Sequence, residues 1–102
     1  MTGQECYELF MRLSGAAEQK KIRNARYVSA ATTLHLEPNW WKVEWTGKGL
    51  RLSGNGHALL IAFDDISGTE FQAETPAAPA MLRIDFKDNP GAVWVNFKAG
   101  VK

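Results

Sequence analysis

Two adjacent carboxylates, Asp64 and Asp65 in the stretch IAFDDISG, are the first residues whose types could support acid–base chemistry. A carboxylate pair acts as general acid and base only when both side chains reach the same substrate. Neighbouring residues of a strand point to opposite faces, so these two would converge only if a bulge turned one of them. We therefore expect the pair to cap the turn at Ser67 and Gly68 rather than to form a catalytic dyad.

The two histidines and the single cysteine are the other side chains that could bind a metal or attack a substrate. His35 and His57 are far apart in the sequence, and neither belongs to an HxH or CxxC pattern. A structural zinc site needs about four converging ligands. Cys6 falls on the apolar face of an expected helix, without an obvious cationic neighbour to stabilise a thiolate. These residues predict no metal, no cofactor and no catalytic nucleophile.

Four cations lie close together in the stretch KKIRNAR: Lys20, Lys21, Arg23 and Arg26. Beside the aromatic Tyr27 they could contact phosphates of nucleic acid or of lipid head groups. Glu18 stands next to the cluster, however, and a solvated helix face is the preferred interpretation. Weak contact with nucleic acid or anionic lipid through residues 20–26 is kept as an alternative.

Tryptophans supply the strongest sign of a binding surface. In the stretch PNWWKVEWTG, strand alternation puts Trp41 and Trp45 on one face and Trp40 on the other. Leu60 and Trp94 also fall at outward positions of their strands, where neighbouring strands have charged residues. A tryptophan buries about 150–250 Å², so an uncovered patch of Trp40, Leu60 and Trp94 would rarely be accidental.

Three kinds of cover could mask this patch. The N-terminal helix could lay Leu9, Phe10 and Leu13 over it. A second copy of the chain or another protein could dock there, or a small apolar ligand could occupy a groove between helix and sheet. The sequence leaves all three interpretations open.

The elements that must position these residues begin with a helix. Thr2 and Glu5 have the spacing of a capping box. Apolar residues then recur at the spacing of an amphipathic helix: Cys6, Leu9, Phe10, Leu13 and Ala17. Ser14 and Gly15 weaken the pattern, so we predict a helix over residues 3–13 and a second helical segment over residues 16–24.

Beyond Arg26, alternation of apolar and polar residues replaces the helical period. The predicted strands cover residues 27–36, 40–46, 49–53, 57–63, 69–74, 80–87 and 92–98. Their links are short and contain Gly, Asn or Pro, which predicts antiparallel neighbours. One row of side chains forms the predicted core: Trp41, Val43, Trp45, Leu50, Leu52, Leu59, Ile61, Phe63, Phe71, Ala73, Leu82, Ile84, Phe86, Val93, Val95 and Phe97.

Composition narrows the class of protein further. The chain has 102 residues, a net charge of +1 and 45% hydrophobic residues, which fits one domain over residues 1–102. A nearly neutral chain lacks the field of a protein that coats DNA or RNA, so nucleic acid and membrane are the less favoured partners. A single cysteine and the lack of an export signal or a long apolar span favour the cytoplasm.

The strand rhythm resembles that of PH-like barrels. The resemblance covers about residues 27–98 and is borne by the stretches LRLSGNGHALLIAFDDISGTEF and AMLRIDFKDNPGAVWVNF. It implies a small antiparallel barrel closed by one helix. That family places its helix after the last strand, whereas this chain would supply one from the N-terminus. The expected class is therefore α+β, with an N-terminal helix packed on a strongly curved antiparallel sheet or a small barrel of about six or seven strands.

The sequence favours a non-enzymatic binding or assembly module that uses the patch of Trp40, Leu60 and Trp94 and pairs with itself or with another protein. The alternative is a small α+β enzyme in which helix and sheet enclose a pocket. Asp64 or Asp85 would then be the general base, although alternation places Asp85 on the outer face.

Overall fold

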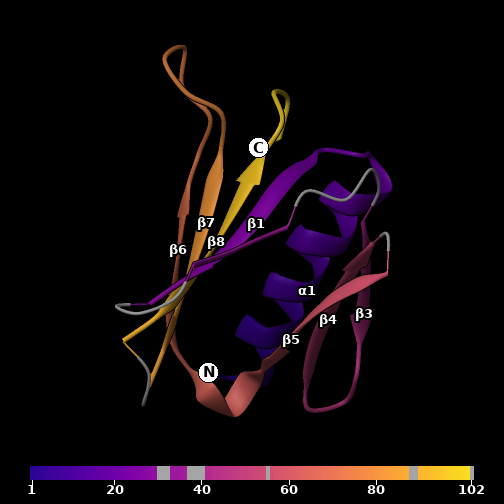
Figure 1. Cartoon of the computed structure of the whole chain (residues 1–102), viewed down its shortest axis with the longest axis vertical. Helices are drawn as coiled ribbons and strands as arrows, with labels where there is room; N and C mark the ends of the chain where they lie inside the picture. The colour runs from indigo at the N-terminus through magenta and orange to yellow at the C-terminus, as the bar shows by residue number, and fades with distance from the viewer. Residues whose placement is uncertain (30–32, 37–40, 55, 88–89, 102) are drawn as a thin grey trace.

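A computed structural model describes residues 1–29, 33–36, 41–54, 56–87 and 90–101. These residues form one α-helix, a short 3-10 helix and eight strands in two antiparallel sheets (Figure 1). The elements are α1 (Gly3–Glu18), β1 (Ile22–Val28), β2 (Thr33–Leu36), β3 (Lys42–Trp45), β4 (Gly49–Gly54), β5 (His57–Ala62), η1 (Phe63–Asp65), β6 (Ile66–Gln72), β7 (Met81–Phe86) and β8 (Ala92–Phe97).

The expected capping box starts helix α1. The Glu5 N–H donates to the Thr2 hydroxyl over 3.1 Å, and the Thr2 N–H donates to the Glu5 carboxylate over 2.9 Å. The hydrogen bond from the Thr2 backbone favours the charged carboxylate and lowers the pKa of Glu5. The helix runs through Gly15 as one element, so its expected end at residue 13 is wrong.

The helix ends earlier than the second predicted segment requires. Lys20 adopts a left-handed conformation with φ of 58°. Its N–H donates to the Ala17 carbonyl, and the Lys21 N–H donates to the Ala16 carbonyl, the hydrogen-bond pattern of a Schellman motif. The expected helix over residues 16–24 is therefore wrong beyond Glu18, and the chain enters strand β1 at Ile22.

Five strands form the larger sheet, in the order β2-β1-β8-β7-β6, and every neighbouring pair is antiparallel. Strands β1 and β2 pair with each other, with Ala25 opposite Leu36 and Tyr27 opposite Leu34. The single strand expected over residues 27–36 is thus wrong, because the chain reverses between β1 and β2. Residues that share the core face are odd-numbered in β1 and even-numbered in β2, so the alternation changes phase across the reversal.

The smaller sheet contains β3, β4 and β5, in that order. Leu50 lies opposite Ile61, and Leu52 lies opposite Leu59, so β4 and β5 share one apolar face. The pairings leave β2, β6, β3 and β5 as edge strands of two separate sheets. The α+β class is confirmed, whereas the single curved sheet or closed barrel of six or seven strands is wrong.

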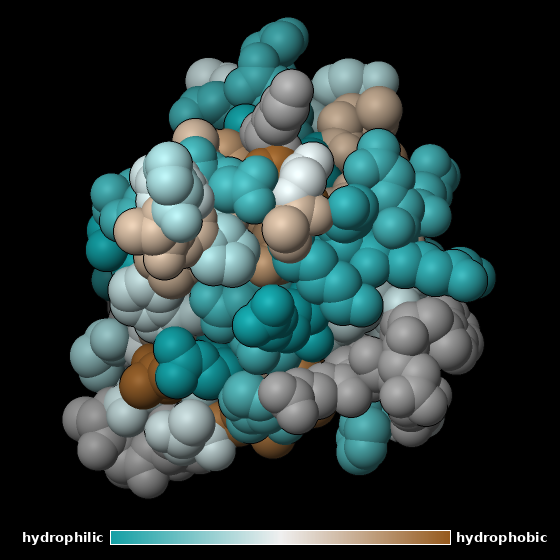
Figure 2. All heavy atoms as spheres, turned by 90° about the horizontal axis from the view of Figure 1, so that it is seen from above, coloured by the Kyte–Doolittle hydropathy of each residue, from teal (hydrophilic) through white to brown (hydrophobic). Residues whose placement is uncertain are grey.

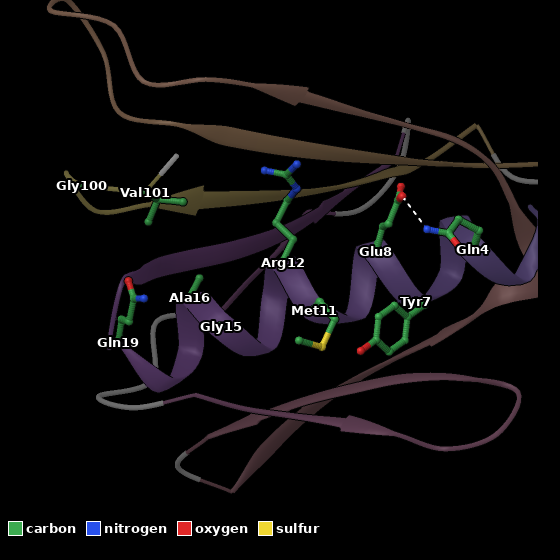
Figure 3. A pocket seen from close by; sticks show the side chains of 10 residues that line it. All are labelled: Gln4, Tyr7, Glu8, Met11, Arg12, Gly15, Ala16, Gln19, Gly100 and Val101. Carbon is green, nitrogen blue, oxygen red and sulfur yellow. Dashed lines mark hydrogen bonds between the residues drawn. The ribbon is translucent and has the colours of Figure 1, made fainter.

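Helix α1 lies between the two sheets (Figures 1 and 3). Leu9 and Leu13 of the helix belong to the same buried cluster as the inward residues of both sheets. Most of the expected core is buried there: Trp41, Leu50, Leu52, Ile61, Phe63, Leu82, Ile84, Val93, Val95 and Phe97. Trp45 and Ala73 are exceptions, because both side chains are exposed. The Trp45 ring instead packs against Phe10 and Phe63, with centroids 5.6 Å and 4.9 Å apart.

In Figure 1, the link between β6 and β7 reaches highest, and the turn between α1 and β1 lies below it at the upper right. Figure 2, seen from above, shows a mostly hydrophilic surface with small, separate hydrophobic areas at this end.

Within the part of the chain that the structure describes, no helix combines the length and apolar character needed to cross a membrane.

Candidate functional site

An apolar groove of about 480 Å³ lies between strand β5 and the larger sheet. It falls within the range of about 300–1,000 Å³ that is typical of ligand sites. The apolar and aromatic residues of its lining come from five strands: Tyr27, Leu34, Leu59, Leu60, Ala62, Phe86 and Val93. Asp65 in η1 adds a carboxylate to this lining.

Cross-strand register builds one wall of the groove. Tyr27 on β1 lies opposite both Leu34 on β2 and Val93 on β8. Its ring passes close to Gly91, where an added Cβ would fall 2.6 Å from the Tyr27 hydroxyl oxygen. The Phe86 ring lies 6.4 Å away, centroid to centroid. Gly91 therefore leaves the space in which this tyrosine lies.

The free edge of β5 forms the other wall. Leu59 and Leu60 point to opposite faces of this strand, yet both line the groove. The groove therefore follows the strand edge itself. Leu60 is 70% exposed, although it lies inside a strand that contains no charged residue. Such exposure is unusual for a leucine in a strand.

The other edge strands have the features by which proteins prevent unwanted pairing, which are charge, irregularity and shortness. Strand β3 has Lys42 and Glu44, and Glu44 also pairs with Arg51 over 2.9 Å. Strand β6 has Glu70 and a register irregularity near Gly68. Strand β2 has four residues. Strand β5, with the sequence HALLIA, has six residues and contains no Asp, Glu, Lys, Arg or Pro.

Two members of the patch expected from the sequence, Leu60 and Trp94, are not brought together. Leu60 lines the groove beside β5, whereas Trp94 lies on β8 of the other sheet. The neighbours of Trp94, Val93 and Val95, are buried in the core, so Trp94 faces away from the helix and from the smaller sheet. Trp40 lies outside the described residues. The first interpretation of the patch required helix α1 to cover it. The helix instead packs on the core side of the larger sheet and does not cover Trp94.

The cationic set lies in a turn and a strand, not on a helix face. Lys20 lies in the turn that follows α1, and the Lys21 ammonium group donates to the Ala99 carbonyl over 2.7 Å. Arg23 and Arg26 belong to β1, and Arg26 lies opposite Trp94 of β8. On the other side of Trp94 lies Arg83 of β7, whose guanidinium is 5.6 Å from the indole centroid.

The carboxylates proposed for acid–base chemistry do not converge. Asp64 and Asp65 are exposed in η1, and Ser67 and Gly68 belong to β6, so the turn expected at Ser67 and Gly68 is wrong. Asp85 lies beside Arg83, with its carboxylate oxygen 3.2 Å from the Arg83 Nε. Neither Asp64 nor Asp85 lines the groove, which Asp65 borders.

A second hollow, of about 670 Å³, runs along the helix. In Figure 3, Glu8 and Arg12 point toward the larger sheet, while Tyr7 and Met11 lie on the side of β3 and β4. The Gln4 amide donates to Glu8 over 3.1 Å, and the Arg12 guanidinium lies 3.7 Å from the Phe71 ring centroid. Gln4 and Glu8 thus bond to each other, and Arg12 packs on the Phe71 ring.

Cys6 is buried on α1, and His57 is an exposed residue at the start of β5. Across the described ranges, no three side chains of His, Cys, Asp or Glu gather as metal ligands. Sequence reasoning missed Tyr27, Leu34 and Phe86 as groove residues. Recognising a hairpin between residues 27 and 36 would have placed Tyr27 and Leu34 side by side.

Comparison with models of protein families, with curated proteins and with solved structures found no match for this chain.

Proposed function

We propose that this chain is a non-enzymatic assembly module in which two copies pair through the free edge of β5. The exposed, uncharged strand HALLIA beside an apolar groove is the observation that supports this most. Alternate backbone groups of an edge strand point away from its sheet and can bond to an added strand. A strand added at β5 would use these groups and would cover the groove.

The sequence of β5 suits antiparallel pairing with its own copy. In the register that places Leu60 opposite the second Leu60, Ala58 faces Ala62 and Leu59 faces Ile61. Every central position then meets an apolar side chain, and small alanines flank the leucine pair. Such cross-strand apolar pairs stabilise a sheet by about 0.2–1 kcal/mol each.

Charge also favours a second copy as the occupant. In a two-fold pair of identical strands, a charged residue on the axis meets its own copy, and such like-charge pairs are destabilising. Strand β5 has no formally charged residue, so it can approach its own copy without that penalty. A two-fold interface of this kind uses the same surface on both copies and closes after two.

Sedimentation velocity over a range of concentrations tests the proposal, with wild type compared with Leu60→Glu. Wild type is expected to shift from monomer to dimer as concentration rises. Leu60→Glu places two carboxylates in the paired edge and should weaken dimerisation by about 100-fold or more. Met11→Glu is the matched control, because Met11 is an exposed apolar residue of the helix hollow and away from β5.

A wild-type monomer at every concentration contradicts the proposal, as does equal weakening by Met11→Glu. An apolar fluorescent dye then distinguishes the other occupants. Enhanced emission with wild-type monomer, lost in Leu60→Glu, would assign the groove to a small apolar ligand. No enhancement with a monomer would leave another protein's strand as the occupant.

A further inference from the structure

We infer that the outer face of the larger sheet, around Trp94, binds single-stranded nucleic acid, a function separate from pairing at β5. The relevant side chains lie in neighbouring strands that are far apart in the sequence. One cross-strand row reads His35, Arg26, Trp94, Arg83 and Glu70 over strands β2, β1, β8, β7 and β6. An aromatic ring is thus flanked by an arginine on each side.

The two arginines differ in their partners. Arg83 pairs with Glu70 over 2.7 Å and with Asp85 over 3.2 Å, so its charge is balanced while it holds the indole. Neither Arg23 nor Arg26 forms an ion pair with any described residue. The Arg26 Nε is also buried without a hydrogen-bond partner among those residues. Strand β1 therefore presents cationic charge that the described part of the fold does not neutralise.

The net charge of +1 averages over an uneven distribution, in which Glu70 and Asp85 balance Arg83 on the outer face while Arg23 and Arg26 form no ion pair with a described residue. Glu5, Glu8 and Glu18 lie on α1, and two further acids lie in η1. The cations of residues 20–26 lie at the end of α1 and along β1, and the Lys98 N–H donates to the Lys21 carbonyl, which brings one more lysine to this end of the strand. A polyanion would meet the positive side of the molecule here.

Groups that could bond to bases lie on the same face. Asn96 is two residues from Trp94 on β8, and its amide donates to the Asn24 carboxamide oxygen of β1 over 2.7 Å. Helix α1 and the smaller sheet pack on the opposite face, so they do not cover this one. A sheet face with an aromatic platform, an asparagine pair and two arginines that lack an ion pair among the described residues has the features that single-stranded nucleic acids require for stacking, base contacts and phosphate contacts.

Single strands fit this face better than duplexes do. Stacking on Trp94 needs an unpaired base with a free π-face, which a duplex does not offer without unstacking. Among the residues that the structure describes, the face has one tryptophan and a few cations, so we expect weak binding with little sequence preference and with strong salt dependence.

Fluorescence anisotropy of labelled oligo(dT) and oligo(U) of about 20 nucleotides tests the inference. Binding tighter than about 100 µM is expected at low salt. Trp94→Leu should weaken it at least about fivefold. Arg26→Gln should reduce the slope of log affinity against log salt by about 0.7. Arg51→Gln removes an arginine from the other sheet and should leave both quantities unchanged.

Leu60→Glu should bind the oligonucleotides as wild type does, which separates this inference from the proposed dimer. If circular dichroism shows that Trp94→Leu is unfolded, the double variant Arg23→Gln/Arg26→Gln decides instead. No binding by wild type, equal losses in Arg26→Gln and Arg51→Gln, or unchanged binding in a folded Trp94→Leu would overturn the inference. Binding to vesicles that contain phosphatidylserine, without binding to either oligonucleotide, would overturn it in favour of a membrane surface.

Discussion

Lys20 determines where the helix gives way to the larger sheet. Its left-handed conformation lets the next N–H reach back to Ala16, and the chain then enters β1. Glycine is the usual residue at this position of a Schellman motif, because a Cβ is strained there. The run KKIRNAR contains no glycine, so no residue in it indicates that the helix ends before it.

Replacing Lys20 with glycine should therefore stabilise the fold. Lys20→Gly relieves the strain of the left-handed conformation, and we expect the free energy of unfolding to rise by about 1 kcal/mol. Lys20→Ala removes the same charge but keeps the Cβ, so it should show no such gain. Urea denaturation measures both values, and a glycine variant less stable than the alanine variant would contradict this description of the turn.

Side-chain parity was the most reliable residue-level signal. It predicted the buried row that includes Trp41, Leu50 and Val95, and it placed Leu60 and Trp94 away from that row. It failed for Trp45 because β3 is an edge strand, where the inward face reaches the border of the core. Parity predicts on which side of a strand a side chain lies, but it does not predict which sheet contains that strand.

At the scale of elements, strands β4 to β8 could be predicted from the sequence. The end of α1, the start of β1 and the reversal between β1 and β2 could not. Alternation and turn residues mark both ends of β4 and β5 closely. Ser67 and Gly68, in contrast, are typical turn residues but lie inside β6, where the register of the pairing with β7 shifts. Long-range pairing decided that segment, and local sequence preference did not.

Alanine substitutions at two glycines, Gly49 and Gly15, test how closely the elements pack. Gly49 lies opposite Ala62, and a Cβ there would collide with the Ile61 carbonyl oxygen. Gly49→Ala should therefore force β4 and β5 apart and cost about 1–3 kcal/mol. Gly15 lies inside α1 with open space around it, so Gly15→Ala should stabilise the helix by about 0.5–1 kcal/mol.

Thermal or urea unfolding of the two variants, beside wild type, measures these opposite changes. The same chemical change at two sites makes each variant the control of the other. A Gly49→Ala variant as stable as wild type would mean that β4 and β5 are not packed as closely as described.

At the scale of the whole molecule, the two surfaces proposed for binding lie in different places. The groove beside β5 opens between the sheets, whereas Trp94 and Arg26 lie on the outer face of the larger sheet. Pairing at β5 would therefore leave the outer face of each copy uncovered. Two linked faces would bind one long strand more tightly than a single face, through effective concentration.

The sequence alone could not reveal this arrangement. The alternation pattern grouped Leu60 with Trp94 in one apolar patch and assigned Arg26 to a separate cationic set. Strand order reverses the grouping, because β8 pairs with β1 and brings Trp94 beside Arg26. Non-consecutive pairing of this kind depends on the whole chain, and no local pattern announces it.

Amide hydrogen exchange of β5, measured at low and high protein concentration, shows whether two copies pair through this edge. If two copies pair through this edge, the N–H groups of β5 that point away from β4 become protected as concentration rises, while those of the β3 edge do not change. The Leu60→Glu variant should show no concentration dependence at either edge. Rapid exchange of the outward β5 amides at every concentration, in a wild-type sample shown to be dimeric, would mean that the copies meet elsewhere and would contradict the account.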